Sequence, residues 1–217
     1  MKSFRIVVAI AALALASLAC QGLSLPGGDT SLLKDDFSDT SSGWGTGTDD
    51  KSSVEYAGSG LQVKVFKDNY FIWTGPNQEK YENVHIEATA NNNSSNQDTA
   101  LGIYCDQQTI TSAFYYFAMT PNGQYAIAEA SVALSDVFLT NNDDWADSDA
   151  ITKNAKSYRI GADCGNGKLT FYVDGKQIAS VSDSSYTAGK AGLFVWSPKE
   201  INSAEVLFDD FVSSPLK

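Results

Sequence analysis

The sequence predicts an all-β protein, specifically an antiparallel two-sheet β-sandwich of the jelly-roll kind. Short runs rich in Val, Ile, Tyr and Phe follow one another, and clusters of Gly, Asn, Asp and Ser separate them. Several separators carry the turn residues of β-hairpins, and no stretch after the N-terminal region shows a sustained helical period. Because so many strands do not fit comfortably into one open sheet, two packed sheets are expected.

The strands are expected in the order in which the apolar runs occur. The expected strands are Leu61–Phe66, Tyr70–Trp73, Val84–Ala90, Ala100–Cys105, Ala113–Met119, Tyr125–Ala130, Tyr158–Cys164, Lys168–Val173, Gln177–Ser182, Ala191–Trp196 and Glu205–Val212. In the third of them, Val84, Ile86 and Ala88 alternate with polar residues, which predicts one buried and one solvated face. The dipeptides Asn122-Gly123, Asn166-Gly167 and Asp174-Gly175 tolerate positive φ and predict hairpins between the strands that flank them.

The segment 113–119 is apolar on both faces, which predicts a central strand whose outward face is also covered. Tyr115 and Phe117 share one face, and Phe114 and Tyr116 share the other. One face packs in the core, and the other could meet a ligand in the concave face of a curved sandwich. Tyr115 and Phe117 are the candidate ligand contacts, although the sequence leaves open which pair faces the groove.

The N-terminus has the outline of a signal peptide. A basic start, Met1–Arg5, precedes an uncharged run of 14 residues, Ile6–Ala19, and then Cys20. The run is shorter than the roughly 20 residues that a helix needs to cross a bilayer. The residues Ala16–Cys20 resemble the lipobox of bacterial lipoproteins, which implies cleavage after residue 19 and lipidation of Cys20. The alternative is ordinary signal cleavage, because Ser17 stands where leucine is usual.

Three parts of the chain follow from this interpretation: a signal peptide at 1–19, a lipidated cysteine with a flexible tether at 20–33, and a β-sandwich domain at 34–217. The tether has turn-forming residues and no periodicity. The protein is expected outside the cytoplasm, held by its acyl chains on a membrane and facing the periplasm or the cell exterior. The folded part is expected to be one monomeric domain.

The charge excludes one class of partner. The full chain has a net charge of −11, and removal of residues 1–19 takes away two of the 15 basic residues and no acidic one, which leaves −13. Such an acidic chain is a poor ligand for nucleic acid. It is equally unsuited to electrostatic adhesion to anionic lipid, so the acyl group is the expected membrane contact.

Cysteine usage fits an oxidising compartment. With Cys20 assigned to lipid, Cys105 and Cys164 remain, each within an expected strand. One disulfide between them is predicted, and two buried free thiols are the alternative.

The order of residues resembles the concanavalin A-like lectin/glucanase sandwiches found in bacterial lipoproteins, including laminin-G-like and keto-disaccharide-hydrolase-like members. The likeness rests on turns and packing positions spread over residues 34–214. The segments that carry it are Asp35–Ser38, Ser42–Trp44, Gly102–Cys105, Thr120–Tyr125, Tyr158–Cys164, Leu169–Gly175, Gly189–Phe194 and Val206–Phe211. The resemblance implies the sandwich fold, but this architecture hosts lectins, glycosidases and adhesion modules alike.

No catalytic residue is assigned from the sequence. Glucanases of this fold usually place their carboxylates as Glu-x-Asp-x-x-Glu on one strand, and the chain has no such motif. The carboxylates Glu87, Glu129 and Asp163 are interpreted as exposed strand residues. His85 is the one histidine, which excludes a multi-histidine zinc site, and it is interpreted as solvated.

Calcium is the cofactor that the acidic residues would suit best. The tripeptide Asp-Asp-Phe occurs at Asp35–Phe37 and again at Asp209–Phe211, and in sandwiches of the resembled family the terminal strands pair. Asp35, Asp36, Asp209 and Asp210 are therefore candidate ligands of a structural calcium ion. In the alternative, one aspartate of each pair caps a turn while the phenylalanines enter the core.

The expected function is non-catalytic binding of a glycan or a cell-envelope component. Trp44, in a Gly/Ser-rich segment, and Trp145, in an acidic loop, are the tryptophans best placed to stack on sugar rings, although tryptophans in sandwiches are also common core residues. The first alternative is a glycoside-hydrolase-like enzyme, in which the fold would bring two carboxylates together in a concave pocket. The second is a structural or protein-binding envelope lipoprotein.

Overall fold

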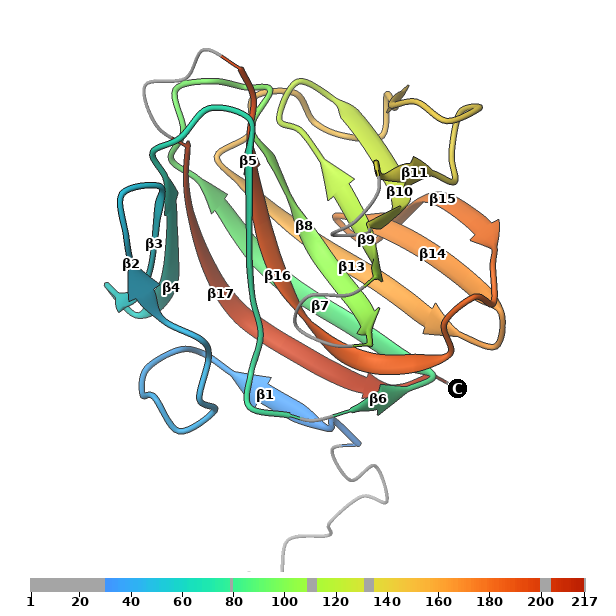
Figure 1. Ribbon diagram of the computed structural model, residues 1–217, viewed down its shortest axis with the longest axis horizontal. Coiled ribbons are helices and arrows are strands. Elements are labelled where there is room, and N and C mark those ends of the chain that lie inside the picture. Colours follow the sequence, from blue (N-terminus) through green and yellow to red (C-terminus); the bar gives the residue numbers. More distant parts are fainter. Residues whose placement is uncertain (1–29, 79, 109–112, 131–134, 200–203, 217) are drawn as a thin grey trace, which may run out of the picture. The chain divides into compact units, whose positions relative to one another are not determined.

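The computed structural model describes residues 30–78, 80–108, 113–130, 135–199 and 204–216 (Figure 1). Cys20, the predicted lipidation site, lies outside the described residues, as do the predicted signal peptide and most of the predicted tether. The described residues form strands and irregular segments without a helix, arranged as two antiparallel sheets. This confirms the predicted jelly-roll β-sandwich. Within the same residues, no helix has the length and apolar character to cross a membrane.

The first sheet, sheet A, contains both the first and the last strand. Its strands are β1 (Leu33–Asp35), β2 (Gly47–Thr48), β3 (Ser52–Ala57), β4 (Gly60–Val65), β7 (Val84–Asn92), β13 (Ser157–Gly165), β14 (Lys168–Val173), β15 (Lys176–Ser182) and β17 (Ala204–Pro215). They follow the order β15-β14-β13-β7-β17-β4-β3-β2, and β1 pairs with β17. The terminal strands therefore lie side by side, with Asp35 opposite Phe211.

The second sheet, sheet B, carries the aromatic strand that the sequence singled out. Its strands are β5 (Tyr70–Thr74), β6 (Tyr81–Glu82), β8 (Ala100–Gln107), β9 (Phe114–Met119), β10 (Gln124–Ala130), β11 (Val137–Phe138), β12 (Ala146–Asp147) and β16 (Ala188–Ser197). They follow the order β11-β10-β9-β8-β16-β5, with β12 paired to β10 and β6 paired to β16. In Figure 1 the strands β5, β16, β8, β9 and β10 form one layer and β7, β13 and β14 form the other.

The three turns predicted from Asn-Gly and Asp-Gly all join hairpins, namely β9–β10, β13–β14 and β14–β15. Asp174 and Gly175 have φ of 51° and 73°, which is the pair of positive values that a type I′ turn requires. A further hairpin, β3–β4, turns at Gly58-Ser59 with φ of 59° and 63°. Strand β3 was not predicted for two reasons. It begins with two polar residues, and the turn that follows it lacks an Asn-Gly or Asp-Gly pair.

The core lies between the two sheets. In β7 the side chains of Val84, Ile86 and Ala88 are fully buried while His85 and Glu87 face outward, as the alternation predicted. From the opposite sheets, Phe117 and Phe171 meet with ring centroids 6.0 Å apart. Full burial of an aromatic side chain of this kind contributes roughly 1.5–3 kcal/mol, so the inward faces of β9 and β14 are a main source of stability.

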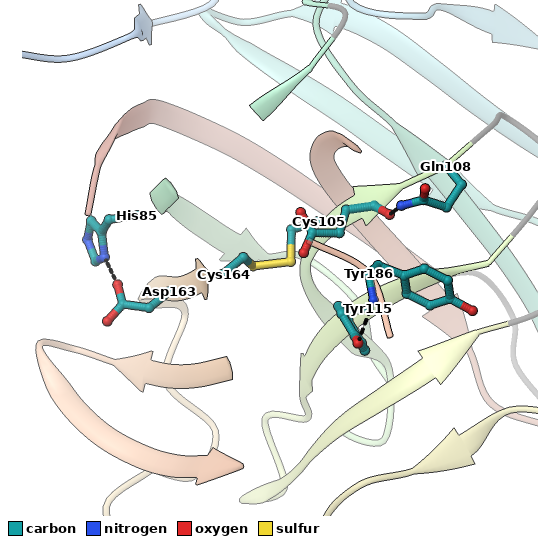
Figure 2. The surroundings of a disulfide bond; sticks show 8 residues. His85, Cys105, Gln108, Tyr115, Asp163, Cys164 and Tyr186 are labelled. Carbon is teal, nitrogen blue, oxygen red and sulfur yellow. Dashed lines mark hydrogen bonds and ion pairs between the residues drawn. A yellow bond between two sulfur atoms is a disulfide. The ribbon is translucent and has the colours of Figure 1, made fainter. Parts of the chain in front are cut away.

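A disulfide between Cys105 and Cys164 joins the two sheets through the core (Figure 2). Cys105 belongs to β8 of sheet B and Cys164 to β13 of sheet A, and the Cα atoms are 6.6 Å apart. The bridge confirms the pairing predicted from cysteine usage. Because it connects residues 59 positions apart, it constrains a long stretch of the unfolded chain.

Candidate functional site

The two faces of β9 divide its aromatic residues between the core and the outside of the sandwich. Tyr115 and Phe117 are fully buried between the sheets, and the Tyr115 hydroxyl accepts a hydrogen bond from the backbone N–H of Tyr186 at 3.2 Å (Figure 2). This corrects the expected ligand contacts, because Tyr115 and Phe117 lie in the core. The outward pair is Phe114 and Tyr116. The sequence could not decide between the pairs, since both faces of the strand are apolar.

The outward face of sheet B is apolar over several strands, which we call the outer aromatic cluster. Its buried members are Tyr104, Phe114, Tyr116, Ala118, Ala126, Ala128, Ala130 and Phe194, and its partly buried members are Phe71, Trp73, Phe138 and Trp145. The ring of Phe71 stacks on that of Phe194, with centroids 4.7 Å apart. An outward sheet face of this composition needs a cover or a ligand, in contrast to the polar outward face of sheet A.

A groove of about 470 Å³, the β5 groove, borders this cluster. It is lined by Gly45, Thr46, Gly47, Thr48, Asp49, Ser52, Val54, Ile72, Trp73, Thr74, Gly75, Pro76, Tyr104, Gln107 and Lys190. Two hydrogen bonds hold the segment Gly45–Asp49 against β5 and the residue after it: Thr74 Oγ1 donates to the Gly45 carbonyl at 2.7 Å, and Gly45 N–H donates to the Gly75 carbonyl at 3.3 Å. This segment contributes one wall of the groove, and β5 with the strands β16 and β8 beside it contributes the other.

The polar side chains of the β5 groove come from both walls. Asp49 Oδ1 accepts the backbone N–H groups of Lys51 and Ser52, each at 2.8 Å, and these hydrogen bonds lower the pKa of the Asp49 carboxyl, so it is charged at neutral pH. On the opposite wall, Lys190 and Gln107 are direct cross-strand partners. The groove therefore offers acceptor oxygens from Asp49 and donors from the exposed Lys190, and the half-buried Trp73 also lines it.

A second, smaller hollow of about 160 Å³ is lined mostly by members of the outer aromatic cluster, and we call it the aromatic pocket. It is lined by Phe71, Ala100, Tyr116, Ala118, Asp136, Phe138, Trp145, Phe194 and Trp196. The rings of Phe138 and Trp145 lie 5.9 Å apart. The pocket is thus enclosed by side chains from the sheet and from the segment that contains β11 and β12.

The two tryptophans chosen as ligand candidates have different positions. Trp145 is half-buried and lines the aromatic pocket. Trp44 is a core residue, because only 4% of it is exposed and its ring packs edge-on against Phe37 and Phe211 at 5.2 and 5.0 Å. Its Nε1–H donates to Asp35 Oδ2 at 2.8 Å. The Gly/Ser-rich surroundings suggested an open loop, but the hydrogen bond to a buried carboxylate draws Trp44 inside.

The acidic residues chosen as calcium ligands are partly brought together. Asp35, Asp36 and Asp210 line one hollow of about 380 Å³ with Asp39, while Asp209 does not line it. Phe37 and Phe211 enter the core, and Asp35 and Asp36 accept the N–H groups of the residues two positions on, as the turn-capping alternative expects. Among the described residues, no group of three or more His, Cys, Asp or Glu side chains is arranged to hold a metal ion. The calcium site stays a prediction.

No protein-family model and no curated protein sequence matches the chain. Solved structures do match its fold. The carbohydrate-binding module CBM66 from Bacillus subtilis aligns with a TM-score of 0.61 and 14% identity over 80% of this chain and 96% of its own. A protein of unknown function with a galectin-like fold, also from Bacillus subtilis, has a TM-score of 0.61 and 11% identity over 86% and 96% of the two chains. The β-glucanase of Bacillus licheniformis aligns with a TM-score of 0.59 and 10% identity over 85% of this chain and 98% of its own.

The protein shares their jelly-roll sandwich fold. At these identities the likeness establishes the arrangement of strands alone, so any activity must be argued from this chain's own side chains.

The carboxylates that could have formed a catalytic group are divided between the sheets. Glu87 on β7 and Asp163 on β13 belong to the outward face of sheet A, where both contact His85. Glu129 belongs to β10 of sheet B and accepts the hydroxyl of Tyr186 at 2.6 Å. These three carboxylates therefore do not meet in one cleft.

His85 has charged partners, in contrast to the solvated histidine that the sequence suggested (Figure 2). Its Nδ1 lies 2.5 Å from Asp163 Oδ1, and its Nε2 lies 3.3 Å from Glu87 Oε1. The hydrogen bond with Asp163, opposed by partial burial and aided by Glu87, raises the pKa of His85. Burial alone would raise the pKa of Asp163, but hydrogen bonds from His85 and Tyr172 outweigh it and lower that pKa.

The raised pKa of His85 predicts how stability depends on pH. A group whose pKa is higher in the folded state stabilises the fold fully below its unfolded pKa, and this contribution is lost as pH rises through the folded value. The free energy of unfolding should therefore fall with rising pH over a range that begins near the ordinary histidine pKa of roughly 6.5. Urea titrations across this range would measure it, with His85→Gln as the control that flattens the slope. An equal slope in both proteins would contradict the assignment to His85.

Proposed function

We propose that the domain is a non-catalytic glycan-binding module and that its glycan occupies the β5 groove. The observation that carries this proposal is a groove lined by the half-buried Trp73 together with the charged side chains of Asp49 and Lys190. A sugar presents an apolar face of C–H groups and a rim of hydroxyls. An aromatic ring can pack on the face while amide, carboxylate and ammonium groups bond the rim.

The dimensions and chemistry of the groove support this ligand class. Its volume of about 470 Å³ falls within the roughly 300–1,000 Å³ typical of small-molecule sites. Asp49 supplies acceptor oxygens and the exposed Lys190 supplies donors, so hydroxyls can both donate and accept there. Among the matched structures, CBM66 is named as a carbohydrate-binding module and another protein as a β-glucanase, which adds support from fold analogy.

The number of carboxylates favours binding over hydrolysis. Glycoside hydrolysis commonly needs two carboxyl groups about 5 to 10 Å apart beside the substrate. Asp49 is the single carboxylate among the described residues that line the β5 groove. A glycoside-hydrolase-like enzyme would require a second carboxyl group at this groove. A structural or protein-binding lipoprotein would require that the groove bind no glycan.

The proposed function includes attachment to a membrane through lipid on Cys20. The disulfide supports export, because such bridges persist in oxidising compartments. The acidic charge of the chain leaves acyl chains as the plausible membrane contact. Phase partitioning of the cell-expressed protein in detergent tests the attachment: the native chain should enter the detergent phase and Cys20→Ala should not. Equal partitioning would disprove the anchor.

The binding function is tested by applying the purified protein to an array of plant, microbial and host glycans and incubating it with the same glycans in solution. We expect saturable binding to one structural class and no release of reducing ends. Binding to none of the glycans would overturn the proposal, and steady release of reducing ends would favour the enzyme alternative.

A further inference from the structure

The aromatic pocket differs in chemistry from the β5 groove. Six aromatic side chains from five segments line a volume of about 160 Å³. They are Phe71 from β5, Tyr116 from β9, Phe138 from β11, Trp145 from the loop before β12, and Phe194 and Trp196 from β16. Phe71, Tyr116 and Phe194 form a mutual trio with ring centroids 4.7 to 5.9 Å apart. Aromatic faces therefore dominate the walls.

One charged side chain, Asp136, lines this otherwise apolar hollow among the described residues. Its Oδ2 accepts the hydroxyl of Tyr116 at 3.0 Å. Burial, together with the neighbouring Asp136 charge, raises the pKa of Tyr116, so the phenol stays protonated and donates to the carboxylate. The bond fixes Asp136 at the pocket, where its negative charge acts on any occupant.

A sugar fits this pocket poorly. Each hydroxyl that loses water must find a hydrogen-bond partner, and an unpaired one costs roughly 1–3 kcal/mol. Besides the carboxylate of Asp136 and the hydroxyl of Tyr116, which already bond each other, the lining side chains offer only the indole N–H groups of Trp145 and Trp196.

A cation without N–H donors fits these walls well. Aromatic faces attract a cation within about 6 Å through the ring quadrupole, and the attraction strengthens when the cation is desolvated. A trimethylammonium group presents methyl groups that carry positive charge and require no hydrogen bonds. Its nitrogen and three methyl carbons, with the attached methylene carbon as a fifth heavy atom, suit about 160 Å³, which is the space of roughly five water molecules at about 30 Å³ each.

We propose that the aromatic pocket binds a quaternary ammonium group of the choline type, with the rings of Tyr116, Trp145 and Trp196 around the cation and Asp136 as its counter-ion. The overall charge of −11 favours the approach of a cation over an anion. This site is separate from the β5 groove and does not depend on glycan binding there.

The test compares choline with its neutral isostere 3,3-dimethylbutan-1-ol, which has the same shape and no charge. Binding to the purified protein is followed by the fluorescence of its tryptophans and by calorimetry. We expect saturable binding of choline and at least roughly tenfold weaker binding of the alcohol, which corresponds to about 1.4 kcal/mol. Asp136→Asn keeps an oxygen that can accept the Tyr116 hydroxyl and should weaken choline binding by a similar factor.

Asp50→Asn, the same substitution at an exposed aspartate that lines neither the β5 groove nor the aromatic pocket, is the matched control and should leave choline binding unchanged. No saturable signal with choline would overturn the proposal. Equal affinity for choline and the alcohol, or an Asp136→Asn variant that binds choline as the native protein does, would also overturn it, because the pocket would then be apolar without selecting charge. Failure of glycan binding on the array would leave this result unaffected.

Discussion

Replacing Trp73 with alanine should weaken binding of the glycan identified on the array by roughly 30-fold, which corresponds to about 2 kcal/mol, the size of a binding hot spot. Trp73 has the largest side chain of the residues that line the β5 groove, and it is half-buried in the free protein, so the sugar can complete its burial. Isothermal titration at one salt concentration would measure the loss. Trp73→Phe should retain part of the affinity, because a smaller ring still packs against the sugar.

Trp145→Ala is the control for Trp73→Ala. Trp145 is also half-buried and belongs to the outer aromatic cluster, but it lines the aromatic pocket and not the β5 groove. The glycan affinity of Trp145→Ala should equal that of the native protein. If Trp73→Ala binds normally while Trp145→Ala does not, the glycan lies in the aromatic pocket, and the proposed site is wrong. Circular dichroism of both variants would establish that the sandwich is intact.

Replacing both Cys105 and Cys164 with alanine should lower the free energy of unfolding by about 4 kcal/mol. In the chain-entropy description, a disulfide that closes a loop of this length lowers the conformational entropy of the unfolded chain, and this destabilises the unfolded state by about 4 kcal/mol. The bridge also joins β8 to β13 across the core, so its loss removes the covalent link between the sheets. Guanidinium denaturation, with the midpoint and slope both fitted, would measure the change.

The native protein with its disulfide reduced is the control for this double variant. Both cysteines are buried, so the alanines also remove some packing, whereas reduction keeps both sulfur atoms. A similar loss in the two samples would assign the effect to the covalent link. A change below about 1 kcal/mol in both would contradict a stabilising role for the bridge.

Much of the fold followed from local sequence. The turn residues at Asn166-Gly167 and Asp174-Gly175 specify hairpins because they adopt positive φ at low cost. The alternation in β7 specifies which side chains enter the core. Strand β3 was missed, because it is held in sheet A by pairing with β4 more than by its own composition.

The candidate site was harder to predict. The sequence favoured Trp44 over Trp73 because Trp44 lies in a flexible-looking segment. The structure reverses this order: Asp35 binds the indole of Trp44 inside the core, and Trp73 on β5 remains half-buried in the groove. The alternation of β5, with Phe71 and Trp73 on one side and Ile72 on the other, is the signal that could have identified it.

By itself the sequence determined the fold class and the main hairpins, because turn chemistry and alternation are local properties, and its cysteine count predicted the pairing of Cys105 with Cys164 once Cys20 was assigned to lipid. Only the tertiary structure decided which aromatic side chains can reach a ligand. Strand β9 is apolar on both faces, so its period of two cannot tell inside from outside. The packing of Phe117 against Phe171 in the opposite sheet settles that choice, leaving Tyr116 for the aromatic pocket.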